Sequence, residues 1–237
     1  KKKLNPKVGL IALSTDQTIE KDFKNVCSNL PLDIFINRIH NQNPLTKENL
    51  LKMREDLASV TNKILPNEKL NTIAYGCTSG TIAIGEDSVK ERILSAKPGS
   101  YVTTPVTSAI KAFKQMNIKK IALFTPYPDA VNKTIIEYFA KKNITVVSFA
   151  SLNLNLDSEF ANVDPDYILE ISPTLEIKNV DALFISCTAL PVLNILSKLE
   201  NKLQKPVLSS NQTLIWDTLR SIGYISPIKG YGKLLEN

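Results

Sequence analysis

The feature that most constrains the fold of this 237-residue sequence is an internal repeat with a period near 110 residues. Three short segments recur in the same order: Ile11–Thr15 matches Ile121–Thr125, Tyr75–Thr78 matches Ile185–Thr188, and Tyr101–Thr104 matches Val207–Ser210. A single match of this length arises often by chance, but three ordered matches at a nearly constant offset do not. The sequence therefore predicts two copies of one structural unit.

Short apolar runs alternate with amphipathic segments along the whole chain, and most of the runs are continuous rather than alternating. Continuous runs are typical of strands buried on both faces of a parallel sheet. The predicted strands are 8–13, 34–39, 72–76, 101–104, 120–125, 145–149, 182–186 and 206–209, and clear helical patterns cover 48–65, 129–142 and 189–203. We expect an α/β protein with two pseudosymmetric domains, each a short parallel sheet flanked by helices.

The repeat also suggests how the chain divides. We expect residues 1–104, together with about 214–237, to form the first half and residues 105–213 the second. The last helix, around 214–222, would then return to pack on the first half. Open parallel sheets bind ligands at the carboxyl ends of their strands, so the active site is expected in the cleft between the two halves.

Composition excludes several classes of protein. The net charge of +6 comes from 29 basic and 23 acidic residues that are interleaved along the chain, which argues against a nucleic-acid surface. Apolar runs stay far below the roughly 20 residues of a membrane span, and no signal-peptide pattern opens the sequence. Three cysteines, one histidine and no CxxC motif support neither a disulfide framework nor a structural zinc site. We expect a cytoplasmic protein that binds neither nucleic acid nor membrane and carries no metal.

Two of the cysteines, Cys77 and Cys187, occupy equivalent places in the repeat, where a strand ends and a helix is expected to begin. Unpaired N–H groups and the helix dipole at such a place favour the thiolate. The neighbouring hydroxyl groups of Thr78, Ser79 and Thr188 add donors that suit a carboxylate or a developing oxyanion. The duplicated position favours a functional role for both cysteines over simple core packing.

Two facing thiols suit chemistry at a carbon atom of the substrate. One cysteine, as thiolate, removes a proton from that carbon or attacks it, and the other, as thiol, delivers a proton from the opposite face of the carbon. This chemistry needs no cofactor. A Cys–His hydrolase is disfavoured because the only histidine, His40, precedes an apparent solvated loop, and Cys27 fits core packing in an amphipathic helix. Phosphate-binding and serine-nucleophile motifs do not occur.

Several motifs resemble those of a known superfamily. Gly76–Gly80, Ser186–Leu190 and Lys205–Gln212 are similar to the aspartate/glutamate racemase superfamily, and most similar to its maleate cis–trans isomerase and arylmalonate decarboxylase branch. The opening Ile11–Asp16 and Thr18–Glu20 resemble the ectoine-utilization racemase-like proteins of that branch. The resemblance extends from about residue 8 to 220. It implies two pseudosymmetric α/β domains, a cofactor-free site with two opposed cysteines, and a homodimer.

The resemblance also implies roles for individual residues. Cys77 and Cys187 match the paired catalytic cysteines, and the implied substrate-binding residues are Thr78, Ser79, Tyr127, Asn132 and Thr188, together with Ser14 and Asp16 of the first strand–helix loop. Asn132 fits a solvated helix position almost as well, and Tyr127 could instead be a packing residue.

The sequence departs from the family pattern at Asp16, where maleate isomerases typically carry an asparagine. An inward carboxylate would repel a second substrate carboxylate or bind an amino or hydroxyl group; alternatively, Asp16 caps a helix that starts at Gln17. Arylmalonate decarboxylases keep one catalytic cysteine, so the presence of both Cys77 and Cys187 argues against decarboxylation.

These observations favour a cofactor-independent isomerase, a racemase or epimerase, of a small amino- or hydroxy-carboxylic acid. The alternative reaction is maleate-type cis–trans isomerisation, which would use the same residues. Two further hypotheses remain open: a non-catalytic relative that binds a small carboxylate, and a redox-sensing protein that forms a Cys77–Cys187 disulfide.

Overall fold

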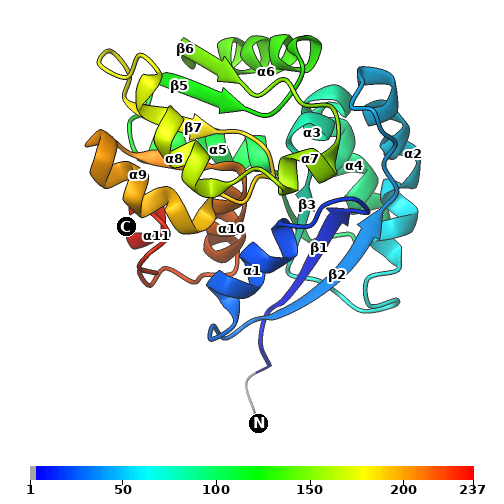
Figure 1. Cartoon of the computed structure of the whole chain (residues 1–237). Helices are drawn as coiled ribbons and strands as arrows, with labels where there is room; N and C mark the ends of the chain where they lie inside the picture. Colours follow the sequence, from blue (N-terminus) through cyan, green and yellow to red (C-terminus); the bar gives the residue numbers. More distant parts are fainter. Residues whose placement is uncertain (1–3) are drawn as a thin grey trace.

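The computed structural model describes residues 4–237, which form two four-stranded parallel sheets (Figure 1). Each of the eight predicted strands is present, with ends that differ from the prediction by at most two residues. The strands are β1 (Lys7–Leu13), β2 (Asp33–Ile39), β3 (Thr72–Gly76), β4 (Tyr101–Thr103), β5 (Lys120–Thr125), β6 (Thr145–Ser151), β7 (Ala182–Ile185) and β8 (Val207–Ser209).

The two sheets have the same topology. Their strand orders are β2-β1-β3-β4 and β6-β5-β7-β8, and every neighbouring pair is parallel. The central strands β1, β3, β5 and β7 are almost entirely buried, because helices cover the sheets. The expected α/β class with two similar parallel sheets is confirmed.

Helices connect the strands of each sheet. They are α1 (Ile19–Cys27), α2 (Lys47–Asn62), α3 (Thr78–Ile84), α4 (Glu86–Ala96), α5 (Pro105–Gln115), α6 (Asp129–Lys141), α7 (Asp157–Ala161), α8 (Pro165–Ile171), α9 (Leu196–Leu203), α10 (Ser210–Ser221) and α11 (Lys233–Glu236). Short 3-10 turns cover Ser172–Thr174 and Leu193–Ile195.

The helix predicted over 189–203 was too long at its start. Regular α-helix begins only at Leu196, after the 3-10 turn Leu193–Ile195. Pro191 lies between Thr188 and that turn; proline lacks an N–H and disfavours helical conformation in the residue before it. The helix predicted around 214–222 starts earlier than expected: Ser209 caps α10, which begins at Ser210. A further short helix, α11, follows it.

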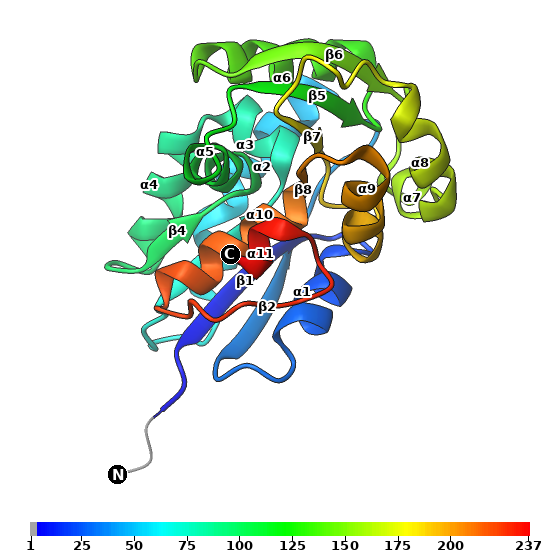
Figure 2. The same ribbon diagram turned by 90° about the vertical axis from the view of Figure 1, so that its left-hand side faces the viewer.

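The two halves exchange helices. Helix α10 follows the second sheet in the chain yet packs against β3, β4 and α5, and Figure 2 shows α5 and α10 together between the sheets. In return, Phe113 of α5 lies edge-on to Phe184 of β7, with ring centroids 5.4 Å apart. This exchange supports a division near residues 104 and 214, which stays a prediction.

The carboxyl ends of both sheets face one another. Helix α7 lies over the loop between β1 and α1 (Figure 1), and a main-chain hydrogen bond of 3.2 Å joins Leu45 N–H to the Asn155 carbonyl. Residues that follow β1, β3 and β7 meet at one place: the Thr18 hydroxyl donates to the Ala189 carbonyl at 2.8 Å, and the Thr188 hydroxyl donates to the Gly76 carbonyl at 3.3 Å. None of the helices between residues 4 and 237 has the length and apolar character needed to cross a membrane.

Candidate active site

Cys77 lies at the junction of β3 and α3, where it caps the helix. Its sulfur accepts the Gly80 N–H at 3.2 Å, and the Ser79 hydroxyl lies 4.0 Å away. A Cβ at residue 80 would approach the Cys77 sulfur to 2.7 Å and the Met53 methyl to 2.8 Å. Glycine is therefore required at position 80 to let the helix N-terminus approach the sulfur.

Cys187 lies two residues after the end of β7 and does not precede a helix directly, so the expectation of a helix dipole at this cysteine was wrong. The chain turns at Thr188 and Ala189, and regular helix resumes only beyond Pro191. The Cys187 sulfur instead accepts the Ala189 N–H at 3.3 Å, and the Cys187 N–H donates to the Ser210 hydroxyl at 3.0 Å.

The two Cys-Thr segments touch each other. The Thr188 hydroxyl donates to the carbonyl of Gly76 at 3.3 Å, and the Thr78 hydroxyl donates to Ser210 Oγ at 2.9 Å. Ser210 thus joins Thr78 to the Cys187 main chain. It was not among the predicted site residues, although its place directly after β8 in the third repeated segment was a usable signal.

Tyr127, in the loop after β5, lies beside both cysteines. Burial raises the pKa of its hydroxyl far above the usual value, with the Cys187 and Cys77 sulfurs as further contributors, and the Thr78 hydroxyl also faces it. Its ring packs edge-on against Phe160 at 5.8 Å. The structure therefore brings Tyr127, Cys77 and Cys187 together in one buried place.

Asn132 uses its amide group within the chain. Its Nδ2 donates to the Tyr127 carbonyl at 2.7 Å, and its Oδ1 accepts the Thr125 hydroxyl. These contacts hold the loop that carries Tyr127, so Asn132 is buried rather than solvated as the alternative interpretation had it. Contact of Asn132 with a substrate stays a prediction.

Asp16 has two different oxygen environments. Its Oδ1 accepts the N–H groups of Thr18 and Ile19 at 2.7 and 2.9 Å and so caps α1, which starts at Ile19 rather than Gln17. Its Oδ2 is buried without a hydrogen-bond partner in the described part of the chain. Burial raises the pKa of Asp16 to about 6, despite the lowering effect of the two N–H groups and of the nearby Thr188 hydroxyl.

Ser14, the other residue predicted in this loop, is exposed, and its hydroxyl donates to Asn41 Oδ1 at 2.9 Å.

A second acid, Asp157 at the start of α7, was missed. Its Oδ2 accepts the Thr15 hydroxyl and the Asn41 amide, the latter at 2.9 Å, so α7 of the second half is tied to two loops of the first. Asp157 is buried, and its charge raises the pKa of both Cys77 and Cys187. No local sequence motif marks this aspartate, because its partners lie more than 100 residues away.

The thiols do not have the lowered pKa expected from their surroundings. Burial raises the pKa of Cys77 to about 12 and raises that of Cys187 as well. The Gly80 N–H and Ser79 hydroxyl act in the opposite direction at Cys77, as do Tyr127 and the Ala189 N–H at Cys187, but burial outweighs them. In this conformation both groups are thiols at neutral pH, and all three cysteines of the chain are free.

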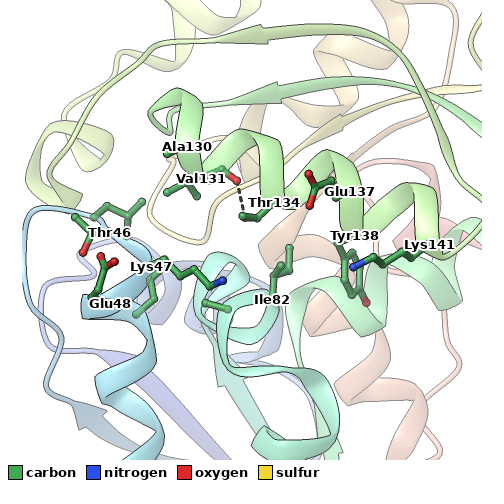
Figure 3. Close-up of a pocket in the computed structure, with 13 residues that line it drawn as sticks. Thr46, Lys47, Glu48, Ile82, Ala130, Val131, Thr134, Glu137, Tyr138 and Lys141 are labelled. Carbon is green, nitrogen blue, oxygen red and sulfur yellow. Dashed lines mark hydrogen bonds between the residues drawn. The ribbon is translucent and has the colours of Figure 1, made fainter.

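Cavities lie beside this buried cluster. One of about 530 Å³ reaches Asp16 between the β1–α1 loop and the start of α7, with Thr15 and Ser158 in its wall. A larger one, about 570 Å³, lies between α2, α3 and α6, where Thr46, Ile82 and Tyr138 line it (Figure 3). Neither cysteine lines either cavity; of the two, only the smaller one has residues predicted for the site, Asp16 among them, in its wall.

The remaining sequence predictions concern residues outside this cluster. Cys27 is buried in α1 among core side chains, as predicted, and burial raises its pKa to about 12. His40 is exposed after β2. Within residues 4–237, no group of three or more histidine, cysteine or acidic side chains is arranged to hold a metal ion.

Comparisons with known proteins show relatives in sequence and in fold. The chain is 26% identical to maleate isomerase from Geobacillus stearothermophilus over 97% of both proteins, and 26% identical to arylmalonate decarboxylase from Bordetella bronchiseptica over 58% of this chain and 59% of that protein. It superposes on the crystal structure of maleate isomerase Iso from Pseudomonas putida S16 with a TM-score of 0.90, at 21% identity and 98% coverage of both chains.

A maleate cis–trans isomerase from Nocardia farcinica, solved as a mutant with a covalently bound succinylcysteine intermediate, gives the same TM-score of 0.90 at 19% identity and 98% coverage of both chains. The family model described as arylmalonate decarboxylase matches residues 84–235, which is more than half of the sequence. This chain therefore belongs to the arylmalonate decarboxylase family.

Proposed function

We propose that this protein is a cofactor-independent isomerase in which Cys77 and Cys187 act on one carbon skeleton, as a racemase or epimerase of a small amino- or hydroxy-carboxylic acid. The observation that carries the proposal is that hydrogen bonds hold the two buried Cys-Thr segments against each other, with the Tyr127 hydroxyl near enough to both sulfurs for them to affect its pKa. The names of the relatives, maleate isomerase above all, support an isomerase.

In the proposed reaction one sulfur, as thiolate, takes the α-proton, and the carbon–hydrogen electron pair moves into the carboxylate as an enolate. The other sulfur, as thiol, returns a proton to the opposite face of the α-carbon. The two cysteines end in exchanged protonation states, which solvent exchange or the reverse turnover restores. Each proton transfer of this kind contributes about 10²–10⁴ in rate.

The neighbouring groups have matching roles. In the proposal, the main-chain N–H and hydroxyl groups of Ser79 at the start of α3 bind the substrate carboxylate as its charge grows. The Thr78 hydroxyl, predicted for the same role, donates to Ser210 in this structure and would have to turn from it to reach the substrate. The Tyr127 hydroxyl faces Cys187 and favours its thiolate, since it lowers the pKa of that thiol. Because burial holds both thiols protonated, the active thiolate must form when substrate binds or when the cluster opens.

The second candidate is maleate-type cis–trans isomerisation. It is favoured by the names of four relatives and by the succinylcysteine intermediate of the Nocardia farcinica enzyme. Here the Cys77 sulfur would add to one alkene carbon while the other carbon takes up a proton. Rotation about the resulting single bond, loss of that proton and departure of the sulfur would give the trans isomer.

Proton NMR in deuterium oxide separates the two reactions. A racemase replaces the α-hydrogen of a single enantiomer by deuterium while optical activity decays, whereas the alternative enzyme converts maleate to fumarate. Cys77→Ser and Cys187→Ser should each lower the rate at least a hundredfold. Retention of full activity by either variant would refute the two-cysteine proposal, and Cys27→Ser is the matched control, because Cys27 is buried in the core outside the cluster.

A further inference from the structure

Two buried carboxylates face the cysteine pair, one from each half of the chain. Asp16 follows β1 and is 1% exposed, and Asp157 begins α7 and is 4% exposed. Each of them raises the pKa of Cys77 and of Cys187, and Asp157 also raises that of Asp16. The reacting carbon of any substrate held between the sulfurs would therefore lie close to two acidic groups.

The hydrogen bonds of these carboxylates leave part of their charge uncompensated. The two N–H groups that Asp16 accepts both bind Oδ1, while Oδ2 is buried and lacks a hydrogen bond in residues 4–237. The Thr188 hydroxyl lies near Asp16 and lowers its pKa, but it donates to the Gly76 carbonyl instead. Asp157 accepts a hydroxyl and an amide, both on Oδ2, and both of these donors are neutral. A buried carboxylate oxygen with no donor is costly, so this arrangement suits a ligand that brings a charged donor.

We infer that the substrate carries a protonated amine, and that Asp16 and Asp157 bind this ammonium group beside the two cysteines. The inference rests on the proposed function and narrows its substrate class to α-amino acids. A hydroxyl group in the same place would donate one hydrogen bond but would leave both charges uncompensated. A second carboxylate, as in maleate, would be repelled by both acids.

An ammonium group there would also assist the chemistry. A positive charge next to a thiol stabilises the thiolate, and it offsets the charges of Asp16 and Asp157 that raise the pKa of both sulfurs. It also makes the neighbouring α-hydrogen more acidic. Substrate binding would in this way lower the pKa of one thiol, and its proton would leave to solvent as the thiolate forms.

The test measures binding without turnover. The Cys77→Ala/Cys187→Ala double variant is titrated by calorimetry with both enantiomers of the common amino acids, with the 2-hydroxy acids of the same carbon skeletons, and with maleate. At least one amino acid should bind at least tenfold more tightly than its hydroxy analogue and than maleate. Tighter binding of a hydroxy acid or maleate, or binding by no amino acid at millimolar concentration, would overturn the inference.

Isosteric variants assign the effect to the two acids. Asp16→Asn keeps an oxygen for the α1 cap, and Asp157→Asn keeps the shape of the side chain. Each, added to the double variant, should weaken amino-acid binding at least tenfold and leave hydroxy-acid binding unchanged or tighter; unchanged amino-acid binding in both would refute the assignment. Asp181→Asn is the matched control. Asp181 is an exposed carboxylate just before β7 that accepts the Lys119 and Lys120 main-chain N–H groups.

The two proposals fail in different ways. Amino-acid binding without any α-hydrogen exchange in the unmodified enzyme would refute the isomerase and keep the ammonium site. Turnover of maleate or a hydroxy acid, with no effect of Asp16→Asn and Asp157→Asn, would keep the isomerase and refute the ammonium site.

Discussion

Thr78 donates a hydrogen bond to the Ser210 hydroxyl at 2.9 Å, across a separation of 132 residues in the chain. The same Ser210 oxygen accepts the main-chain N–H of Cys187 at 3.0 Å. One buried hydroxyl at the start of α10 therefore fixes the residue after Cys77 relative to the main chain of Cys187. The spacing of the two sulfurs depends on this contact.

Replacement of Ser210 by alanine should reduce both stability and turnover. It leaves the Cys187 N–H buried without an acceptor, at a cost of about 1–3 kcal/mol in the free energy of unfolding. Because the two cysteines would lose their common support, kcat should fall at least tenfold while KM changes little. Urea unfolding and steady-state kinetics measure the two effects.

Thr218→Val is the control for this variant. Thr218 is a buried hydroxyl on the same helix, and it donates only to the Leu214 carbonyl one turn earlier. This variant should keep its kcat. Equal losses of kcat in Ser210→Ala and Thr218→Val would show that Ser210 acts only through the general stability of α10.

The sequence could predict elements whose cause is local. The eight strands are continuous apolar runs because both faces of each sheet are buried, and Cys77 and Cys187 stand out because the repeat places each at a strand end. Asp157 escaped prediction because its partners are distant in the chain and no local pattern records such contacts, whereas Ser210 was missed although the third repeated segment places it at a strand end. The raised pKa of Cys77 also depends on burial, which the neighbouring residues alone do not determine.

Asp217 should be a major anchor of α10 on the first half. Its buried carboxylate accepts the hydroxyls of Thr103 and Ser108 at 2.6 and 3.0 Å and the Lys111 ammonium at 2.8 Å. Asp217→Ala removes the acceptor that these three donors share and should lower the free energy of unfolding by about 1–3 kcal/mol. Lys111→Met should cost about 1 kcal/mol or less, because Lys111 is half exposed. Similar losses in the two variants, measured by urea unfolding, would contradict this account.

Stability should depend on pH through Asp22. Burial raises the pKa of Asp22 from its ordinary 3.8 to about 7, and the charge of Asp16 raises it further. The Asn211 amide, which donates to Asp22 at 2.8 Å, and the charge of Lys21 act in the opposite direction. Between pH 3.8 and about 7 the folded protein therefore holds a proton that the unfolded chain has released. The free energy of unfolding therefore falls as the pH rises through this window.

The measurement compares urea unfolding at about pH 5 and about pH 8. At about 1.4 kcal/mol for each pH unit between the two pKa values, Asp22 should contribute a loss of up to a few kcal/mol. Asp16, whose pKa burial raises to about 6, adds a smaller change of the same sign. Asp22→Asn should flatten the dependence, and the exposed Glu91→Gln should leave it intact. A dependence of the same size in Asp22→Asn would assign it to other groups.

Alkylation should report whether the hydrogen bonds that tie α7 to the first half also control access to the buried cysteines. Because burial raises the pKa of Cys77 to about 12, iodoacetamide should modify it at neutral pH at least about tenfold more slowly than a free thiol of pKa 9.0. Asn41→Ala removes the 2.9 Å hydrogen bond to Asp157 that ties α7 to the first half, and should raise the alkylation rate several-fold at Cys77 and Cys187.

Peptide mass spectrometry follows each cysteine separately. Buried Cys27 is the internal reference, and the exposed Asn201→Ala is the control variant. Equal acceleration at Cys27 would mean that Asn41→Ala loosens the whole fold, whereas acceleration confined to Cys77 and Cys187 would show that α7 controls access to the pair.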